Sequence, residues 1–256
     1  MRVTLLGTGT SHGIPMIGCD CAVCRSDDPR DRRTRTSAWV EAGAARVLID
    51  VSPELRLQCV ANDVRRVTAV LLTHAHADHV AGLDDLRRFN DLQKQPLTVY
   101  GPADAVGRVT TMFGYAFRDD PAYPSTKPRL RAAAVEGPFD PGGCLVTPLP
   151  LRHGQQTIFG YRIGGFAYCT DCSGIPDATR PLLGGIDLLV LGALRHTPHP
   201  THFTLAQAVD AATQIGARQT LFTHIAHELQ HAPTNAGLPP GMALAFDGQT
   251  IELPDP

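Results

Sequence analysis

The chain contains the run Thr73-His74-Ala75-His76-Ala77-Asp78-His79, in which three imidazoles and one carboxylate occupy six positions directly after the apolar run 68–72. Imidazole and carboxylate are the ligands that hold zinc, manganese or iron in open, catalytic sites. If a strand ends near Thr73, the run continues as a loop into a helix, so that two side chains turn one way and two the other. The run therefore predicts half of a two-metal centre rather than a solvated polar loop.

Two metal ions need about seven or eight ligands, so further ligands are expected at other strand ends. Three polar side chains follow apolar strand candidates and precede a loop: His153, Asp171 and His224. Each alone could be a capping or core side chain, but together with the first run they complete a ligand set. Asp50, which follows the apolar run 47–49, either orders a ligand histidine or is an exposed aspartate at a strand end.

Apolar runs and turn signals alternate along the whole chain. Strands are predicted at Val3–Leu6, Ala38–Val40, Arg46–Ile49, Ala69–Thr73, Leu97–Tyr100, Cys144–Leu149, Ile158–Ile163, Ala167–Thr170, Leu188–Leu191, Thr220–Thr223, Ala243–Phe246 and Thr250–Leu253. Helices are predicted at Pro53–Asn62, Gly82–Asn90, Ala103–Phe113, Ile175–Leu183 and Leu205–Ile215. Strands come first in clusters and then alternate with helices, which indicates two sheets with helices outside them. We find no linker, and expect one domain over residues 1–256.

Composition excludes several classes of protein. The 256 residues carry a formal net charge of −2, which gives no general attraction to nucleic acid or anionic membrane. No run approaches ~20 apolar residues, and the N-terminus lacks the apolar core and cleavage site of a signal peptide. We therefore expect a cytoplasmic protein without a membrane partner. The mostly basic run 30–35 is predicted to be a solvated loop.

Seven cysteines in a chain without an export signal do not suggest a disulfide framework. Cys19, Cys21 and Cys24 place three thiols in one tight loop, which would need a fourth ligand to close a tetrahedral metal site. The alternative is three unrelated reduced cysteines. The other four are predicted to be packed side chains, although the spacing of the last two would also suit a redox or metal-binding pair: Cys59, Cys144, Cys169 and Cys172.

These motifs resemble the ordered metal motifs of the metallo-β-lactamase superfamily, and within it the phosphonate-pathway phosphoribosyl 1,2-cyclic phosphodiesterase group. The resemblance extends from residue 3 to about 253 and is carried by the runs 6–10, 19–24, 73–79, 201–205 and 223–227, with His153 and the run 168–171. It implies an α/β fold, a four-layer αββα sandwich with the site at one edge of the two sheets. It also implies a small zinc-binding loop at 17–36.

The resemblance assigns two ligand sets and a bridging residue: His74, His76 and His153 for one metal, Asp78, His79 and His224 for the other, and Asp171 between them. The two divalent ions would be manganese, zinc or iron, which all accept these ligands. The resemblance also implies one structural zinc held by Cys19, Cys21, Cys24 and His227. A closed site of this kind has no open position, so it would anchor the loop and not catalyse.

The segment 199–205 bears on the reaction. In phosphodiesterase branches of the superfamily, a histidine at the place of His202 faces the substrate phosphate without binding metal. We assign His202 the same role, neutralising charge or protonating the leaving oxygen; the alternative is a simple helix-entry residue. The expected reaction is hydrolysis of a small phosphodiester, on the resemblance a cyclic ribose phosphate, by a metal-bridging hydroxide. His202 and Asp78 are the predicted catalytic residues.

Three alternatives remain open. A tRNA 3′-end endonuclease shares these motifs, but it needs an RNA-docking surface that a mildly acidic chain without a Gly-rich arm does not predict. A thioesterase or lactonase would use the same metals, and a metal-holding accessory protein would use them for no reaction. The resemblance suggests a homodimer. Five residues have no firm assignment: His12, Arg87, Arg88, His196 and His199.

Overall fold

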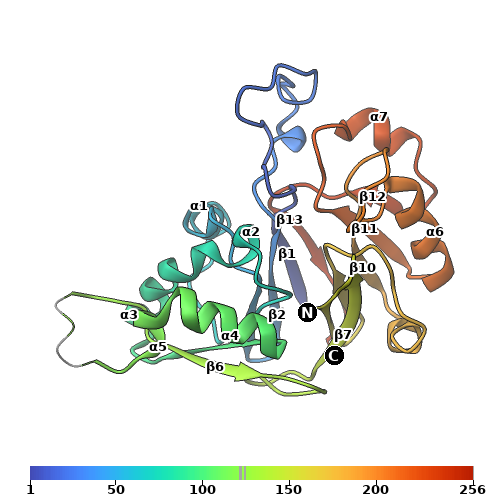
Figure 1. Cartoon of the computed structure of the whole chain (residues 1–256). Coiled ribbons are helices and arrows are strands. Elements are labelled where there is room, and N and C mark those ends of the chain that lie inside the picture. Colours follow the sequence, from blue (N-terminus) through green and yellow to red (C-terminus); the bar gives the residue numbers. More distant parts are fainter. Residues whose placement is uncertain (121–122, 124, 256) are drawn as a thin grey trace.

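The computed structural model describes residues 1–120, 123 and 125–255, and consists of two β-sheets face to face with helices on their outer sides (Figure 1). The strands are β1 (Arg2–Gly7), β2 (Ser37–Ala42), β3 (Ala45–Ile49), β4 (Ala69–Leu71), β5 (Leu97–Gly101), β6 (Leu130–Ala134), β7 (Val146–His153), β8 (Gln156–Ile163), β9 (Phe166–Cys169), β10 (Leu188–Gly192), β11 (Gln219–Thr223), β12 (Met242–Leu244) and β13 (Gln249–Glu252). Within the described residues they form a seven-stranded sheet of order β13-β1-β2-β3-β4-β5-β6 and a six-stranded sheet of order β12-β11-β10-β9-β8-β7.

Helices cover the outer face of each sheet. The α-helices are α1 (Leu55–Ala61), α2 (Ala77–Val80), α3 (Arg87–Gln93), α4 (Ala103–Met112), α5 (Gly114–Phe117), α6 (Leu205–Ile215) and α7 (His231–Ala236), and the 3-10 helices are η1 (Pro29–Asp31), η2 (Ala81–Leu86) and η3 (Arg180–Leu183). Helices α1 to α5 lie beside the first sheet, and α6 lies beside the second (Figure 1). No helix of the described residues has the length and apolarity needed to cross a bilayer.

The apolar core has three layers, because successive strand residues point to opposite faces of a sheet. In β3, Val47 and Ile49 pack between the two sheets, whereas Leu48 packs against the helices of the first sheet. The outer face of the second sheet packs against α6 through residues such as Ala208. The predicted αββα sandwich is therefore confirmed. The four cysteines predicted as packed side chains are buried: Cys59, Cys144, Cys169 and Cys172.

Parallel strands bring their carboxyl ends to one edge of the sandwich. Strands β3 and β4 are parallel in the first sheet, and β9, β10 and β11 are parallel in the second. Asp50 follows β3, Asp171 follows β9 after one residue, and His224 follows β11 directly. Chain segments that are far apart in sequence therefore deliver polar side chains to one place.

The prediction of a helix over Ile175–Leu183 is wrong. Only the short η3 forms there, because Pro176 and Pro181 have no N–H to donate to a helical hydrogen bond. The prediction of α6 is confirmed at both ends. Thr204 caps its start in a reciprocal pair with Gln207, and Gly216 ends it in the left-handed conformation. Strand β6 was not predicted, since its Leu-Arg-Ala-Ala-Ala sequence has low strand propensity.

The basic run 30–35 is also not a solvated loop throughout. Arg33 and Asp31 are buried and form an ion pair with 3.1 Å between Arg33 Nη2 and Asp31 Oδ1. The run belongs to the segment 8–36 between β1 and β2, which rises from the sheets in Figure 1 and returns to them. Burial of Arg33 fixes the returning arm of this segment against the body of the protein.

Candidate metal centre

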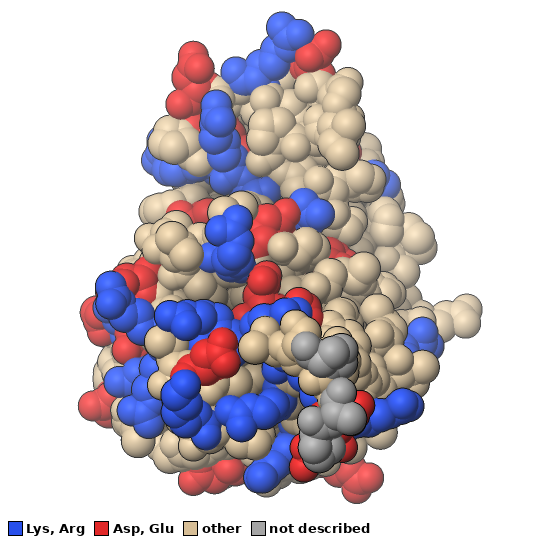
Figure 2. Space-filling view, turned by 90° about the vertical axis from the view of Figure 1, so that its left-hand side faces the viewer, with Lys and Arg blue, Asp and Glu red and all other residues tan. Residues whose placement is uncertain are grey.

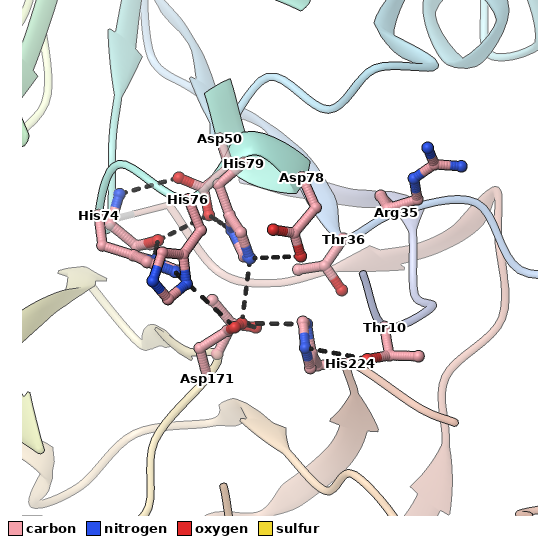
Figure 3. A network of polar contacts seen from close by, with 12 residues as sticks. Thr10, Arg35, Thr36, Asp50, His74, His76, Asp78, His79, Asp171 and His224 are labelled. Carbon is pink, nitrogen blue, oxygen red and sulfur yellow. Dashed lines mark hydrogen bonds and ion pairs between the residues drawn. The ribbon is translucent and has the colours of Figure 1, made fainter. Parts of the chain in front are cut away.

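The run Thr73–His79 forms the junction between β4 and α2, as predicted. The strand ends at Leu71, His74 lies in the loop, and His76 is the residue that precedes the first turn of α2. Asp78 and His79 lie in that turn. The change from loop to helix gives the side chains of the run two different directions, which Figure 3 shows around a common centre.

A first group of three imidazoles lies on one side of this centre. His74 and His76 come from the loop, and His153 is the last residue of β7. One ring nitrogen of each lies within 4.8 Å of the others, with 3.0 Å between His74 Nε2 and His76 Nδ1. Three converging imidazole nitrogens with a solvent-accessible side are a ligand arrangement typical of catalytic zinc sites.

A second group combines two carboxylates with two imidazoles. His79 Nε2 lies 3.3 Å from Asp78 Oδ2 and 3.3 Å from Asp171 Oδ1, and His224 Nδ1 lies 3.0 Å from Asp171 Oδ1. The other oxygen of Asp171, Oδ2, lies 3.9 Å from His74 Nε2 of the first group. Asp171 therefore faces both groups (Figure 3), which is the geometry expected of a ligand shared by two ions.

The hydrogen bonding of the second group fits a bound cation. His79 Nε2 and His224 Nδ1 are buried and have no hydrogen-bond partner among the described residues. Buried ring nitrogens without a partner are rare and costly. A divalent ion fits because imidazole nitrogens and carboxylate oxygens would then all be satisfied by one partner.

The other ring nitrogens are held by the protein. Asp50 Oδ2 lies 2.7 Å from His79 Nδ1, and the Asp50 carboxylate also accepts from the Thr73 backbone N–H and hydroxyl at 2.8 Å each. His153 Nδ1 faces two carbonyl oxygens, to which it can only donate: that of Asp171 at 2.5 Å and that of Thr201 at 2.9 Å. Such partners fix the tautomer that leaves the opposite nitrogen free for a metal. Asp50 is thus buried and orients His79, a candidate ligand, and is not an exposed strand-end residue.

Charges within the site shift the pKa values strongly. Burial would raise the pKa of Asp171, but His224 and His79 hold it well below its usual range. Burial would lower the pKa of His79, but Asp171 and Asp50 outweigh this effect and raise it well above its usual range. Burial and the neighbouring His79 lower the pKa of His74. The carboxylates around His79 therefore stabilise positive charge at this position, as a cation site requires.

Backbone strain is concentrated at this site. Five non-glycine residues of the described chain have positive φ, and three of them are Asp50, Asp171 and His224, with φ of 60°, 55° and 57°. The left-handed region is unfavourable for residues with a Cβ and persists where the surroundings hold the backbone firmly. Here the left-handed turn at each strand end points the side chain back across the edge of the sheet.

His202 lies next to both groups. Its ring centroid is 4.8 Å from that of His153 and 4.9 Å from that of His224, on which it stacks. It precedes the first turn of α6, so the Thr204 cap fixes the backbone near it. Burial lowers the pKa of His202 to about 3, with a further contribution from His224, so the ring is neutral at pH 7.

The four predicted ligands of the structural zinc also come together, three from the loop and His227 from the chain after β11. Cys19 Sγ and Cys21 Sγ each lie 3.3 Å from His227 Nδ1, and Cys24 Sγ lies 3.8 Å from it. The backbone N–H of Cys24 donates to Cys21 Sγ at 3.4 Å and is the main cause that lowers the Cys21 pKa to about 6. Three sulfurs around one imidazole nitrogen, with N–H support, fit a tetrahedral zinc.

The residues without a firm assignment lie mostly elsewhere. His12 and His196 are exposed, whereas the ring of His199 packs 4.9 Å from that of His202. Arg87 and Arg88 line a groove between α1 and α3 that contains none of the candidate ligands. Figure 2 shows this helical face, where Lys and Arg side chains are interspersed with Asp and Glu. The two arginines therefore do not form a wall of the metal centre.

Two contacts of the site could not be predicted from the sequence. Thr10 Oγ1 lies 3.3 Å from His224 Nε2. Arg35, at the edge of the network in Figure 3, pairs its guanidinium with Glu54. Thr10 belongs to the run 6–10 noted in the sequence. Its role was not visible there, because the contact depends on the segment 8–36 returning to the second sheet.

Comparison with known proteins identifies the class. The family model for the Beta-lactamase superfamily domain matches residues 45–225, the range that contains all the candidate active-site ligands. The chain belongs to the metallo-β-lactamase superfamily and is a metal-dependent hydrolase. Within the superfamily it belongs to the PhnP-like group. A solved structure described as a new diphosphatase from the PhnP family is 41% identical, with a TM-score of 0.92, over 99% of this chain and 98% of that chain. The resemblance noted in the sequence is confirmed.

Two curated relatives add context. A protein of Porphyromonas gingivalis named octanoyltransferase is 40% identical over 256 residues, which cover 97% of this chain and 51% of that relative. The chain therefore spans about half the length of that relative. A coenzyme PQQ synthesis protein B of Methylobacterium radiotolerans is 39% identical over 231 residues, which cover 77% of this chain and 74% of that relative.

Proposed function

We propose that the chain is a dinuclear-metal phosphodiesterase that hydrolyses a small diester to a phosphomonoester. The observation that supports this most is Asp171, whose two oxygens face the two ligand groups, beside a histidine that belongs to neither group. One ion would bind at His74, His76 and His153, and the other at Asp78, His79 and His224. When bound, two divalent ions lower the pKa of a shared water and neutralise charge on phosphoryl oxygens.

The chain's own residues prepare the site for this chemistry. Asp50 accepts a hydrogen bond from the Nδ1 proton of His79, so that Nε2 faces the centre and can give its lone pair to an ion that displaces its own proton. Thr10 and the Thr201 carbonyl oxygen hold His224 and His153 in the same way. The ligands are therefore oriented before any substrate binds, which reduces the cost of reorganisation during the reaction.

His202 would contact the substrate phosphate. A neutral imidazole donates one hydrogen bond to a phosphoryl oxygen and accepts a proton on its other nitrogen. A bound anion raises the pKa of an adjacent imidazole, because opposite charge favours the protonated form. The pKa of free His202 is about 3, so a bound phosphate would have to raise it before the ring takes up a proton from solvent and passes it to the leaving oxygen.

We further propose that Cys19, Cys21, Cys24 and His227 bind one structural zinc. The three thiols and the imidazole leave no open position, so this ion would stabilise the loop and take no part in hydrolysis. Metal analysis of protein with and without the Cys21→Ser substitution tests this: the variant should contain one zinc fewer per chain.

The substrate is tested with a panel of compounds on protein loaded separately with manganese, zinc and iron. A cyclic ribose phosphate, which the group resemblance favours, would be compared with a linear bis-aryl phosphate and a diphosphate, since the neighbouring structure is described as a diphosphatase. We expect turnover of diesters to exceed that of diphosphates and to be lost in His202→Ala. Turnover of the diphosphate alone would contradict the diester proposal.

Thioester hydrolysis is a second candidate, favoured by the relative named octanoyltransferase, half of which the chain matches. An octanoyl thioester in the same panel separates the two reactions. Precursor tRNA in a further assay tests the endonuclease alternative. The homodimer suggested by the resemblance stays a prediction that sedimentation velocity would test.

A further inference from the structure

The active site and the cysteine loop, which is the zinc-binding loop predicted at 17–36, are joined by one short chain segment. His224 belongs to the second ligand group and His227 to the cysteine cluster, three residues further on. The two residues between them, Ile225 and Ala226, are buried. Three residues span at most about 10 Å, so His224 and His227 are joined by one short, buried stretch of backbone.

The segment 8–36 leaves the sheets by an outgoing arm at residues 8–10 and comes back by a returning arm near Thr34. The outgoing arm is hydrogen-bonded to Ile225 and to the returning arm. The Ile225 N–H donates to the Thr8 carbonyl at 2.9 Å, and the Thr10 N–H donates to the Ile225 carbonyl at 3.1 Å. The Gly9 N–H donates to the Thr34 carbonyl of the returning arm at 2.7 Å. The arms of the cysteine loop and the chain that carries His224 therefore form one hydrogen-bonded unit.

His224 needs such support. Its backbone is left-handed with φ of 57°, and its Nε2 has a contact at 3.3 Å with Thr10 Oγ1 from the outgoing arm. A left-handed residue with a side chain returns to a relaxed conformation unless its surroundings prevent it. The supports on either side of His224 are the strand β11 and the segment 225–227. In that segment Ile225 is bonded to Thr8 and Thr10, the Ala226 N–H donates to the Leu194 carbonyl at 2.8 Å, and His227 faces the three sulfurs.

The cysteine loop has little else to hold its outer part. Its own apolar cluster is small and consists of Ile14, Val23 and Cys24 with Met16, Cys19 and Cys21 packed against them. Ile17 at its outer turn is fully exposed, and a Cβ on Gly18 would touch nothing within 4 Å. The contacts of the three sulfurs with His227 are thus the main tie between the outer loop and the segment that carries His224.

We propose that the cluster of Cys19, Cys21, Cys24 and His227 is a positioning element for the second active-site metal. Zinc bound in the loop fixes His227, and thereby holds His224 in its left-handed, metal-binding conformation. Loop zinc then raises the affinity of the position formed by Asp78, His79 and His224 for its ion, and leaves the position of His74, His76 and His153 unchanged. The proposal depends on the metal assignments above but on no substrate.

Cobalt titration of the apo Cys21→Ser variant tests the coupling in one direction. Cobalt bound to thiolates gives a near-ultraviolet charge-transfer band, whereas cobalt at His and Asp ligands gives only visible bands, so the two kinds of site are measured separately. We expect the variant to lose the charge-transfer band and to bind the second active-site cobalt about 10- to 100-fold more weakly, the usual cost of losing an orienting partner. Ile17→Ser, in the same loop but outside the cluster, is the control and should bind like the wild type.

The wild-type protein tests the reverse direction and does not depend on the variant folding. Coupling between two binding sites is reciprocal, so filling the active site should strengthen zinc binding in the loop by the same factor. Manganese serves as the probe because it prefers oxygen ligands, which the active site supplies as carboxylates, to thiolates. Competition with a chromophoric zinc chelator should show tighter loop zinc when manganese is present. A change below about twofold, less than typical coupling between sites, would overturn the proposal.

Discussion

Asp50→Asn should weaken metal binding without unfolding the protein. Asp50 is fully buried, and its two oxygens accept three hydrogen bonds from Thr73 and His79. Asparagine has nearly the same shape but replaces one acceptor oxygen by an NH₂ donor. If that NH₂ faces His79 Nδ1, either two donors meet or the His79 proton moves to Nε2, the nitrogen needed for the metal. If the amide turns over, the NH₂ meets the Thr73 backbone N–H instead.

The arrangements in which the proton stays on His79 Nδ1 leave one buried donor without an acceptor, which costs about 1–3 kcal/mol. If the His79 proton moves to Nε2 instead, metal binding has to reverse that move and bears the same cost. Because 1.4 kcal/mol corresponds to a tenfold change, the metal affinity falls about 5- to 150-fold. That range includes the 10- to 100-fold effect typical of residues that orient a metal ligand. We therefore expect roughly a 10- to 100-fold rise in the dissociation constant of one active-site ion.

Isothermal titration of apo protein with zinc or manganese measures this, with circular dichroism to verify the fold. Asp63→Asn is the matched control, because Asp63 also has positive φ, at 52°, but is exposed and far from the ligands in the chain. Asparagine tolerates the left-handed region at both positions. Metal affinity unchanged in Asp50→Asn, or lowered equally in Asp63→Asn, would refute the reasoning.

Three further predictions concern other parts of the chain. His202→Ala should lower diester turnover by about 100- to 10,000-fold and leave the metal content unchanged. Kinetics and elemental analysis measure these two quantities, and loss of an ion would show that His202 is a metal ligand. The folded pKa of Asp247 is about 6 because burial raises it above the ordinary 3.8, so its protonated form favours the folded state. The free energy of unfolding of the wild type should therefore fall relative to that of Asp247→Asn by about 3 kcal/mol as pH rises from about 4 to about 6. Urea unfolding at a series of pH values measures this, and parallel pH curves for the two proteins would contradict it. Arg33→Ala should destabilise the fold by about 3–5 kcal/mol, since it leaves the buried Asp31 carboxylate without its cation. Arg30→Ala, at the exposed pair with Asp28, should change nothing measurable.

The sequence was most informative where apolar strands end in polar residues. The ligand candidates lie at strand ends: His153 is the last residue of β7, and Asp171 and His224 follow β9 and β11. Strands that run in one direction bring such positions to one edge of a sheet. The α6 helix was equally clear, because its cap residues Thr204 and Gly216 are local signals.

Long-range packing explains what the sequence did not reveal. Burial of Arg33 depends on Asp31 and on the arms of the segment 8–36 closing against the body, which no local pattern encodes. The contact of Thr10 with His224 likewise joins residues 214 positions apart. Strand β6 forms at the edge of its sheet by pairing with β5, despite an alanine-rich sequence that local propensity would not assign to a strand.

The most direct test of the account is an anomalous-diffraction experiment on crystals of the zinc-loaded protein. The account predicts two peaks in the active site, about 3.5–4 Å apart, one bound by His74 and His76 and the other by Asp78 and His79, with Asp171 touching both. It also predicts a third peak among Cys19, Cys21, Cys24 and His227. A single active-site peak, or an ion held by residues of both halves of the run Thr73–His79, would contradict the division of that run between two metals.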